Sequence, residues 1–167
     1  MLQEMHLSIS RNKWAVIVLF KKLIVKKGKS IKLNYKPKLE FSLIGISSHE
    51  NDYHLSWAIN KHLLLNLTRS DNISIMNKQH EIVQEFAVSS FDDEETMLLY
   101  NLISNTGEKG FLFTELRNID YFLQIYGELN ETQLKALQNQ LKSIDIVSAS
   151  FIIDPGSLKS PEKLLFN

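Results

Sequence analysis

The stretch "FTELRNIDYFLQIYG", residues 113–127, joins a polar segment to an alternating apolar run. Apolar side chains recur in it at every second position, which places them on one face of a β-strand: Ile119, Tyr121, Leu123 and Ile125. Gly127 ends the run. The stretch therefore predicts a strand with one buried face, and the two acidic residues, the Arg and the Asn near its beginning are either the start of that strand or a site.

A strand and a helix are expected before this stretch. "LEFSLIGISS", residues 39–48, is a mostly apolar run of strand length. Ser47, followed three residues later by Glu50, has the pattern of a capping box, and the helix that it opens is expected to run to about Asn66. The buried stripe of this helix is expected to consist of Leu55, Ala58, Ile59, His62 and Leu63.

The segment between this helix and residue 105 predicts a pair of strands. "HEIVQEFAVSSF", residues 80–91, alternates, with one face formed by Ile82, Phe86 and Val88. An acidic run from Asp92 to Glu95 interrupts the pattern before "TMLLYNLIS", residues 96–104, resumes it. The simplest interpretation is a β-hairpin.

A second helix and a last strand are expected after Gly127. Asn130 with Gln133 again has the pattern of a helix start, and the apolar side of the helix is expected to consist of Leu134, Leu137, Leu141 and Ile144. "DIVSASFII", residues 145–153, then predicts a strand, which Pro155 and Gly156 end.

The order of these elements predicts the fold class. Strand, helix, a meander of about three strands, helix and strand, without an internal repeat, indicate an α+β single domain. We expect an antiparallel-dominated sheet of about five strands with two helices packed on one face. The domain is expected to span residues 33–156, between a basic N-terminal arm (1–32) and a C-terminal tail (157–167).

The composition narrows the class of protein. The chain has 167 residues, 44% of them hydrophobic, which is enough for one domain around one core. It contains no Cys, and this excludes a disulfide framework, a thiol nucleophile and a thiolate metal site. We therefore expect a cytoplasmic protein. "WAVIVLF", residues 14–20, is too short to span a membrane and lacks a cleavage site for export, but a segment lying on a membrane surface stays open.

The charges are distributed unevenly. Residues 1–38 hold ten of the 19 basic residues and one of the 19 acidic residues, which leaves 9 basic and 18 acidic residues in the rest of the chain. A basic arm on an acidic body indicates either a polyanion-binding segment or a segment foreign to the domain, disordered or peripheral, that follows a start codon placed too far upstream. The candidate polyanion contacts are Lys21, Lys22, Lys26, Lys27 and Lys29.

A resemblance to a known family rests on the opening stretch. "FTELRNIDYFL", residues 113–123, is similar to the signature of the IPExxxVDY family of Bacteroidetes proteins: Glu115, Asp120 and Tyr121 match, whereas Phe113, Thr114 and Ile119 replace its Ile, Pro and Val. Residues 41–63, 91–105 and 158–166 also resemble the family, so the resemblance covers about residues 33–167. It implies no catalytic residue. Replacement of the signature Pro by Thr114 makes a bend at that position less strongly expected.

The signature residues and two residues in the segment 41–63 are the candidate interaction residues: Glu115, Asp120, Tyr121, Asp52 and Tyr53. Acid–base catalysis by the signature residues would require their side chains to converge, but Asp120 and Tyr121 are neighbours on a strand and point to opposite faces. We expect instead that Asp120 and Glu115 accept backbone N–H bonds and that Tyr121 packs with its hydroxyl at the edge of the core.

The histidines indicate no metal site. Glu50 and His54 are four residues apart and could face one ion, but a third ligand is missing, and His62 is expected to pack in the apolar stripe. No catalytic residue, cofactor or metal ligand is predicted, and whether the chain is an enzyme stays open, with a preference against it.

Two functions remain. The first is a non-catalytic protein-interaction domain with an exposed patch or edge strand, which the absence of a catalytic constellation favours. The second is an RNA- or ribosome-associated protein that binds through its basic arm. The acidic body argues for the first, because it would repel a polyanion.

Overall fold

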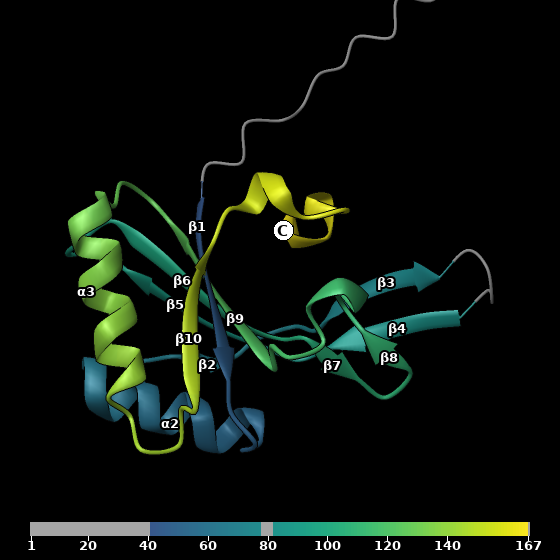
Figure 1. Cartoon of the computed structure of the whole chain (residues 1–167), viewed down its shortest axis with the longest axis horizontal. Helices are drawn as coiled ribbons and strands as arrows, with labels where there is room; N and C mark the ends of the chain where they lie inside the picture. Colours follow the sequence, from purple (N-terminus) through teal and green to yellow (C-terminus); the bar gives the residue numbers. More distant parts are fainter. Residues whose placement is uncertain (1–40, 78–81, 167) are drawn as a thin grey trace, which may run out of the picture. The chain divides into compact units, whose positions relative to one another are not determined.

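The computed structural model describes residues 41–77 and 82–166. Its centre is a sheet of six antiparallel strands in the order β10-β1-β9-β6-β5-β2 (Figure 1). These strands are β1 (Phe41–Ser47), β2 (Thr68–Arg69), β5 (Val88–Asp93), β6 (Leu98–Ser104), β9 (Tyr121–Tyr126) and β10 (Ala149–Ile153). The predicted α+β class with an antiparallel sheet is confirmed, and the sheet has one strand more than the sequence suggested.

Two helices, two small hairpins and three short 3-10 helices complete the described fold. They are α2 (Asp52–Leu63), α3 (Glu131–Lys142), the hairpin of β3 (Ile73–Asn77) with β4 (Ile82–Phe86), the hairpin of β7 (Thr106–Gly107) with β8 (Gly110–Phe111), η1 (Thr114–Leu116), η2 (Pro155–Ser157) and η3 (Pro161–Leu164). The two small hairpins lie together at the side of the sheet away from α3 (Figure 1). Each helix has 12 residues, and neither has the length and apolar content that crossing a membrane requires.

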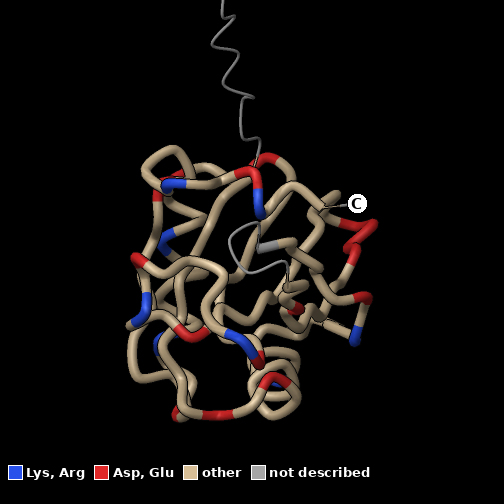
Figure 2. The backbone as a smooth tube through the Cα atoms, turned by 90° about the vertical axis from the view of Figure 1, so that its right-hand side faces the viewer, with Lys and Arg blue, Asp and Glu red and all other residues tan. Residues whose placement is uncertain are grey.

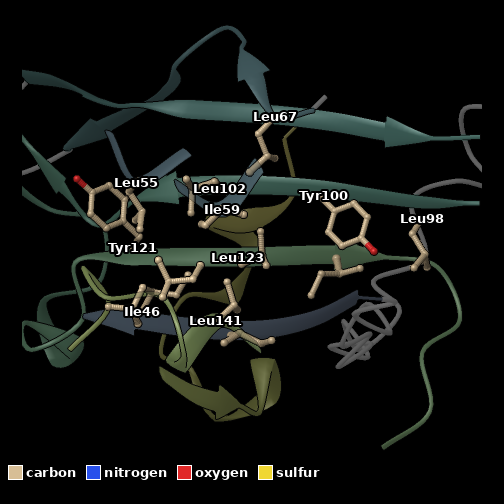
Figure 3. Close-up of a cluster of buried hydrophobic side chains, with 14 residues drawn as sticks. Ile46, Leu55, Ile59, Leu67, Leu98, Tyr100, Leu102, Tyr121, Leu123 and Leu141 are labelled. Atoms are coloured by element: carbon tan, nitrogen blue, oxygen red, sulfur yellow. The ribbon is translucent and has the colours of Figure 1, made fainter. Parts of the chain in front are cut away.

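The sheet separates two hydrophobic clusters, because successive side chains of a strand point to opposite faces. On the helix side, Leu123 of β9 packs with Leu55 and Ile59 of α2 and Leu141 of α3 (Figure 3). The other cluster contains Phe122 of β9 with buried side chains from outside the main sheet, namely Phe86, Leu112, Phe113, Ile119, Leu158 and Leu164. Both helices thus cover one face, as predicted.

The start and end of α2 differ from the prediction. Ser47 belongs to β1, and its hydroxyl donates to the carbonyl oxygen of Asn118 at 2.6 Å. The cap is Asn51, whose Oδ1 accepts the backbone N–H of His54 at 2.8 Å. The helix ends at Leu63, three residues before the expected end, because Leu64 adopts a left-handed conformation with φ of 56°.

The predicted stripe of α2 is partly wrong. Its buried residues are Leu55, Ser56 and Ile59, while Ala58 and Leu63 pack against the same cluster. His62 is exposed. By contrast, the capping box of α3 is confirmed, since the Asn130 side chain and the Gln133 side chain each accept the other residue's backbone N–H at 2.9 Å.

The signature segment does not run straight into its strand. The chain forms η1 at Thr114–Leu116, and Ile119 N donates to the carbonyl oxygen of Leu116 at 3.0 Å, so β9 begins only at Tyr121. Ile119 packs in the cluster that contains Phe122, on the far face of the sheet, which is the face away from the two helices. It does not pack with Tyr121 and Leu123. The expectation that Ile119 shares their face is therefore wrong, because the period of two holds only where every intervening residue is extended.

The predicted hairpin forms between β5 and β6, with the turn at the acidic run. Residues 80–91, however, are not one strand. Ala87 separates β4, which pairs with β3, from β5, which pairs with β6. Phe86 and Val88 are buried, whereas Ile82 is 38% exposed.

Residues 157–166 are part of the folded core, not a tail. Leu158 and Leu164 are buried in the cluster on the far face. Gln124, which is fully buried in β9, donates from Nε2 to the carbonyl oxygen of Leu164 at 2.8 Å and fixes this segment to the sheet. A boundary at residue 156 would therefore remove part of the core.

Candidate functional site

Asp120 ties the start of β9 to the end of β1. Its Oδ2 accepts the backbone N–H of Ser48 at 2.9 Å, and its own N–H donates to the carbonyl oxygen of Ile46 at 3.0 Å. The carboxylate thus satisfies a backbone donor just beyond the last residue of β1. The predicted backbone role of Asp120 is confirmed.

Tyr121 packs in the helix-side cluster with 7% of its surface exposed, and its hydroxyl donates to the carbonyl oxygen of Glu50 at 2.6 Å. Burial, reinforced by the negative charges of Asp52, Asp120 and Glu50, raises the pKa of Tyr121 to about 12. The phenol therefore stays protonated near neutral pH and acts as a hydrogen-bond donor. The predicted position of its hydroxyl at the edge of the core is confirmed (Figure 3).

Glu115 contacts the C-terminal segment. Its Oε1 accepts the backbone N–H of Lys159 at 3.1 Å. Burial opposes ionisation of this carboxyl, but backbone N–H groups of Glu115 and Lys159 and the charges of Lys159 and Lys163 outweigh it and lower the pKa of Glu115. Asp120 and Tyr121 bind backbone groups of the loop at residues 48–50, whereas Glu115 binds the C-terminal segment, so the three side chains do not converge as an acid–base set would require.

Asn105, which no sequence pattern predicted, holds the loop before β9. Asn105 is fully buried. Its Oδ1 accepts the N–H of Phe113 at 2.9 Å, and its Nδ2 donates to the carbonyl oxygens of Leu116 and Ile119 at 2.9 and 2.8 Å. No signal in the sequence distinguishes Asn105 from an ordinary turn residue, because its partners lie eight to fourteen positions away.

The outer side of α2 exposes aromatic side chains. Tyr53 is 79% exposed and Trp57 is 51% exposed, one helical turn apart. Tyr53 is one of the candidate interaction residues predicted from the sequence, and Trp57 is not. A signal was present, since Trp57 lies two positions from both Leu55 and Ile59 and so falls on the opposite side of the helix from the buried stripe.

Trp57 lies between two hollows. One, of about 380 Å³, opens between α2 and β2 and is lined by Asp52, Tyr53, Ser56, Trp57, Asn60, Leu67, Arg69 and Ser89. The other, of about 420 Å³, opens between α2 and the end of α3 and is lined by His54, Trp57, Ala58, Lys61, His62 and residues 143–146. We call Tyr53, Trp57, Lys61 and Arg69, which border these hollows, the Trp57 surface.

The rim of the Trp57 surface carries the positive charges of Lys61 and Arg69 and the negative charge of Asp52. Lys61 Nζ lies 5.2 Å from the centroid of the Trp57 ring, within range of a cation–π interaction. Arg69 pairs through Nη1 with Asp52 and donates from Nη2 to Asn72 Oδ1 at 2.7 Å. Candidate residue Asp52 therefore orients Arg69 at this surface, next to candidate residue Tyr53.

In the hollow between α2 and the end of α3, His62 lies beside Ser143. This serine is not an activated nucleophile. His62 Nε2 lies 2.9 Å from Ser143 Oγ. The Ser143 hydroxyl already donates to the carbonyl oxygen of Gln140 at 2.7 Å, so His62 must be the donor of the pair. A base that activates serine would have to accept that proton instead.

The described residues contain no group of three or more His, Asp or Glu side chains able to hold a metal ion. Glu50 Oε2 and His54 Nδ1 lie 2.8 Å apart and bond to each other. Every buried side-chain nitrogen or oxygen in the described ranges has a hydrogen-bond partner. The polyanion candidates Lys21, Lys22, Lys26, Lys27 and Lys29 lie outside the described residues.

Comparison of the chain with family models, curated proteins and solved structures finds no match.

Proposed function

We propose that the chain is a non-catalytic protein-interaction domain that binds a protein partner on the Trp57 surface. The observation that carries this proposal is the position of Trp57, half exposed on a packed helix with a hollow on each side. Tryptophan, tyrosine and arginine are the side chains that most often dominate the energy of protein–protein interfaces. The Trp57 surface combines all three.

The shape of the surface indicates how a partner would bind. Two side chains of the partner, one on each side of the Trp57 ring, would fill the two hollows and bury the exposed half of the indole. Lys61 and Arg69 would lie at the rim, where charged groups add specificity and speed association more than they add affinity. Asp52 would keep Arg69 extended toward the partner, which lowers the entropy that Arg69 loses on binding.

The family and the compartment belong to the same proposal. We infer membership of the IPExxxVDY family, which is supported by the matched residues Glu115, Asp120 and Tyr121, because each makes a contact that joins two segments of the fold. We place the protein in the cytoplasm, which is supported by the absence of Cys from the sequence.

The experiment is photocrosslinking in living cells, with a photoreactive phenylalanine at position 53 of the tagged full-length chain. We expect one discrete adduct, which mass spectrometry identifies. For the purified pair, Trp57→Ala should weaken binding by about 2 kcal/mol or more, as removal of a central aromatic does. Phe151→Ala is the matched control, because Phe151 is an aromatic side chain of similar exposure on β10.

The outcome that rejects this proposal is equally specific. If Trp57→Ala and Phe151→Ala affect the adduct and the affinity to the same extent, the Trp57 surface is not the binding surface. Thermal melts of both variants show that each is folded before it is compared.

Binding of RNA or the ribosome through the basic arm is the second candidate, and the ten Lys and Arg residues in 1–38 favour it. Its test is RNA binding by the full-length chain over a range of salt concentrations. Affinity should fall steeply as salt rises, because phosphate contacts release counterions. Replacing Lys21, Lys22, Lys26, Lys27 and Lys29 with Gln should make the affinity less dependent on salt. If the salt dependence is unchanged, these lysines do not contact the RNA and the second candidate function is rejected.

A further inference from the structure

The hairpin of β3 and β4 has one covered edge and one open edge. On the β4 side, Gln84 Nε2 donates to the carbonyl oxygen of Lys109 at 2.8 Å. The backbone there is so close that a Cβ on Gly107 would collide with the carbonyl oxygen of Glu85. On its other side, β3 pairs with no strand of the described chain, and Figure 1 shows it as the outer strand.

Side chains that would discourage strand pairing are absent from the described part of β3. Exposed edge strands usually carry a charge, a proline or a bulge that prevents them from pairing with another chain. Residues 73–76 are Ile, Ser, Ile and Met, with no charged residue and no proline. Met76 is 58% exposed, and its cross-strand neighbour Val83 is also exposed. Apolar surface therefore adjoins the open edge.

By contrast, the two edge strands of the main sheet, β2 and β10, are protected against pairing with another chain. At one end, β2 has only two residues, one of them the charged Arg69. At the other end, α3 covers β10, where Gln138 Nε2 donates to the carbonyl oxygen of Ser150 at 2.8 Å and Ser150 Oγ donates back to the carbonyl oxygen of Gln138 at 3.1 Å. At these two ends the open edge thus carries a charged or covering group, whereas residues 73–76 of β3 include no charged residue.

We propose that β3 pairs with β3 of a second copy of this chain, antiparallel about a two-fold axis at Ile75. In this register Ile75 lies opposite Ile75 of the partner subunit, and Ser74 lies opposite Met76 of the partner subunit. Two-fold symmetry allows the same strand to serve both partners. The result is a continuous four-stranded sheet, which is more stable than an isolated two-stranded hairpin.

A second copy fits this edge because residues 73–76 are uncharged and place no like charges opposite each other. The part of the chain after Lys38 has 9 basic and 18 acidic residues, so repulsion between two bodies should weaken the pair at low salt. One strand pair buries less than a standard interface of about 1,600 Å². We therefore expect a weak dimer whose population rises with protein concentration.

The first test is sedimentation equilibrium of the full-length protein, whose monomer mass is 19.3 kDa. The mean mass should rise toward twice this value with concentration. Met76→Lys should raise the dimer dissociation constant by about tenfold or more, because it places a charge at the pairing edge. Met97→Lys is the matched control, since Met97 is 79% exposed in the turn between β5 and β6. If Met76→Lys melts early, Ser74→Lys at an exposed position replaces it.

The second test locates the contact. Because the sequence contains no Cys, Ser74→Cys gives a single thiol for a short bis-maleimide crosslinker. We expect efficient crosslinked dimers from Ser74→Cys and only background from Met97→Cys. A chain that stays monomeric at high concentration overturns the proposal. So does a dimer that Met76→Lys leaves intact, or equal crosslinking at the two positions, either of which would assign the contact to another surface or partner.

Discussion

The hydroxyl of Tyr121 donates a hydrogen bond of 2.6 Å to the backbone carbonyl oxygen of Glu50. This bond joins the first residue of the central strand β9 to the loop that leads into α2, 71 positions away in the sequence. The neighbouring Asp120 fastens the same loop through Ser48 N. The consecutive residues Asp120 and Tyr121 thus position the helix that presents the Trp57 surface.

Of Glu115, Asp120 and Tyr121, Tyr121 should be the most costly to replace. We expect Tyr121→Ala to lower the free energy of unfolding by about 3 to 5 kcal/mol, as truncation of a buried aromatic does. Tyr121→Phe keeps the ring and should cost about 1 kcal/mol for the lost hydrogen bond. Urea unfolding measures both. Tyr53→Ala, at an exposed tyrosine, is the control and should stay within about 0.5 kcal/mol of the wild type.

The raised pKa of Tyr121 predicts a pH dependence at the alkaline end. The folded state keeps the phenol protonated up to a pKa of about 12, whereas the unfolded chain has the ordinary value of 10.0. The contribution of the protonated Tyr121 phenol to the free energy of unfolding is complete below pH 10 and is lost as the pH rises from 10 toward 12. The difference in unfolding free energy between wild type and Tyr121→Phe should therefore shrink over that interval. A constant difference would contradict the assigned environment.

Asp120→Asn and Glu115→Gln should each cost about 1 kcal/mol, because each weakens a charge-assisted bond to a backbone N–H. For Glu115 the pKa is lowered in the folded state, so its contribution is present above the ordinary value of 4.5 and is lost as the pH falls below it. Melts of wild type and Glu115→Gln at neutral and acidic pH should therefore converge at low pH. If either variant melts above the wild type but loses partner binding, the segment 113–123 is a binding site and its role is not structural.

Asn105→Ala should destabilise the loop before β9 more than its place in a turn suggests. The substitution removes three hydrogen bonds and leaves the N–H of Phe113 and the carbonyl oxygen of Ile119 without their Asn105 partner, at a cost of about 2 to 4 kcal/mol. Amide hydrogen exchange of residues 113–121 should accelerate. Thr106→Ala, at the exposed next position, is the control, and an equal effect of the two variants would refute the role of Asn105.

Removal of residues 157–167 should destabilise the domain, because this segment buries two leucine side chains. The loss of Leu158 and Leu164 from the far-face cluster should cost about 3 to 6 kcal/mol, and Gln124 would lose an acceptor in the core. Thermal unfolding measures the effect, and Leu165→Ala, at an exposed leucine of the same segment, is the control. Unchanged melting of the shortened chain would mean that the segment does not stabilise the sheet.

The sequence predicted the features that depend on neighbouring residues. The capping box of α3 and the alternation of Tyr121, Leu123 and Ile125 are local patterns, and both are found in the structure. The roles of Glu115 and Asp120 followed from the same reasoning, since a carboxylate beside the start of a strand has backbone donors within reach. Tyr53 and Asp52 were named as candidates, but nothing local indicated that they adjoin a hollow.

Tertiary structure decided the features that depend on distant segments. The turn after η1 places Ile119 on the face of the sheet away from the helices, because its N–H donates to the carbonyl oxygen of Leu116 and its carbonyl oxygen accepts from Asn105 Nδ2. The packing of α2 on the sheet exposed His62 and Trp57 while burying Ile59. Gln124 fixes residues 157–166 to the core through its hydrogen bond to the carbonyl oxygen of Leu164, which is 40 positions away in the sequence. Periodicity along the chain fixes which side chains share a face, but only the packing of other segments determines which face is buried and what covers it.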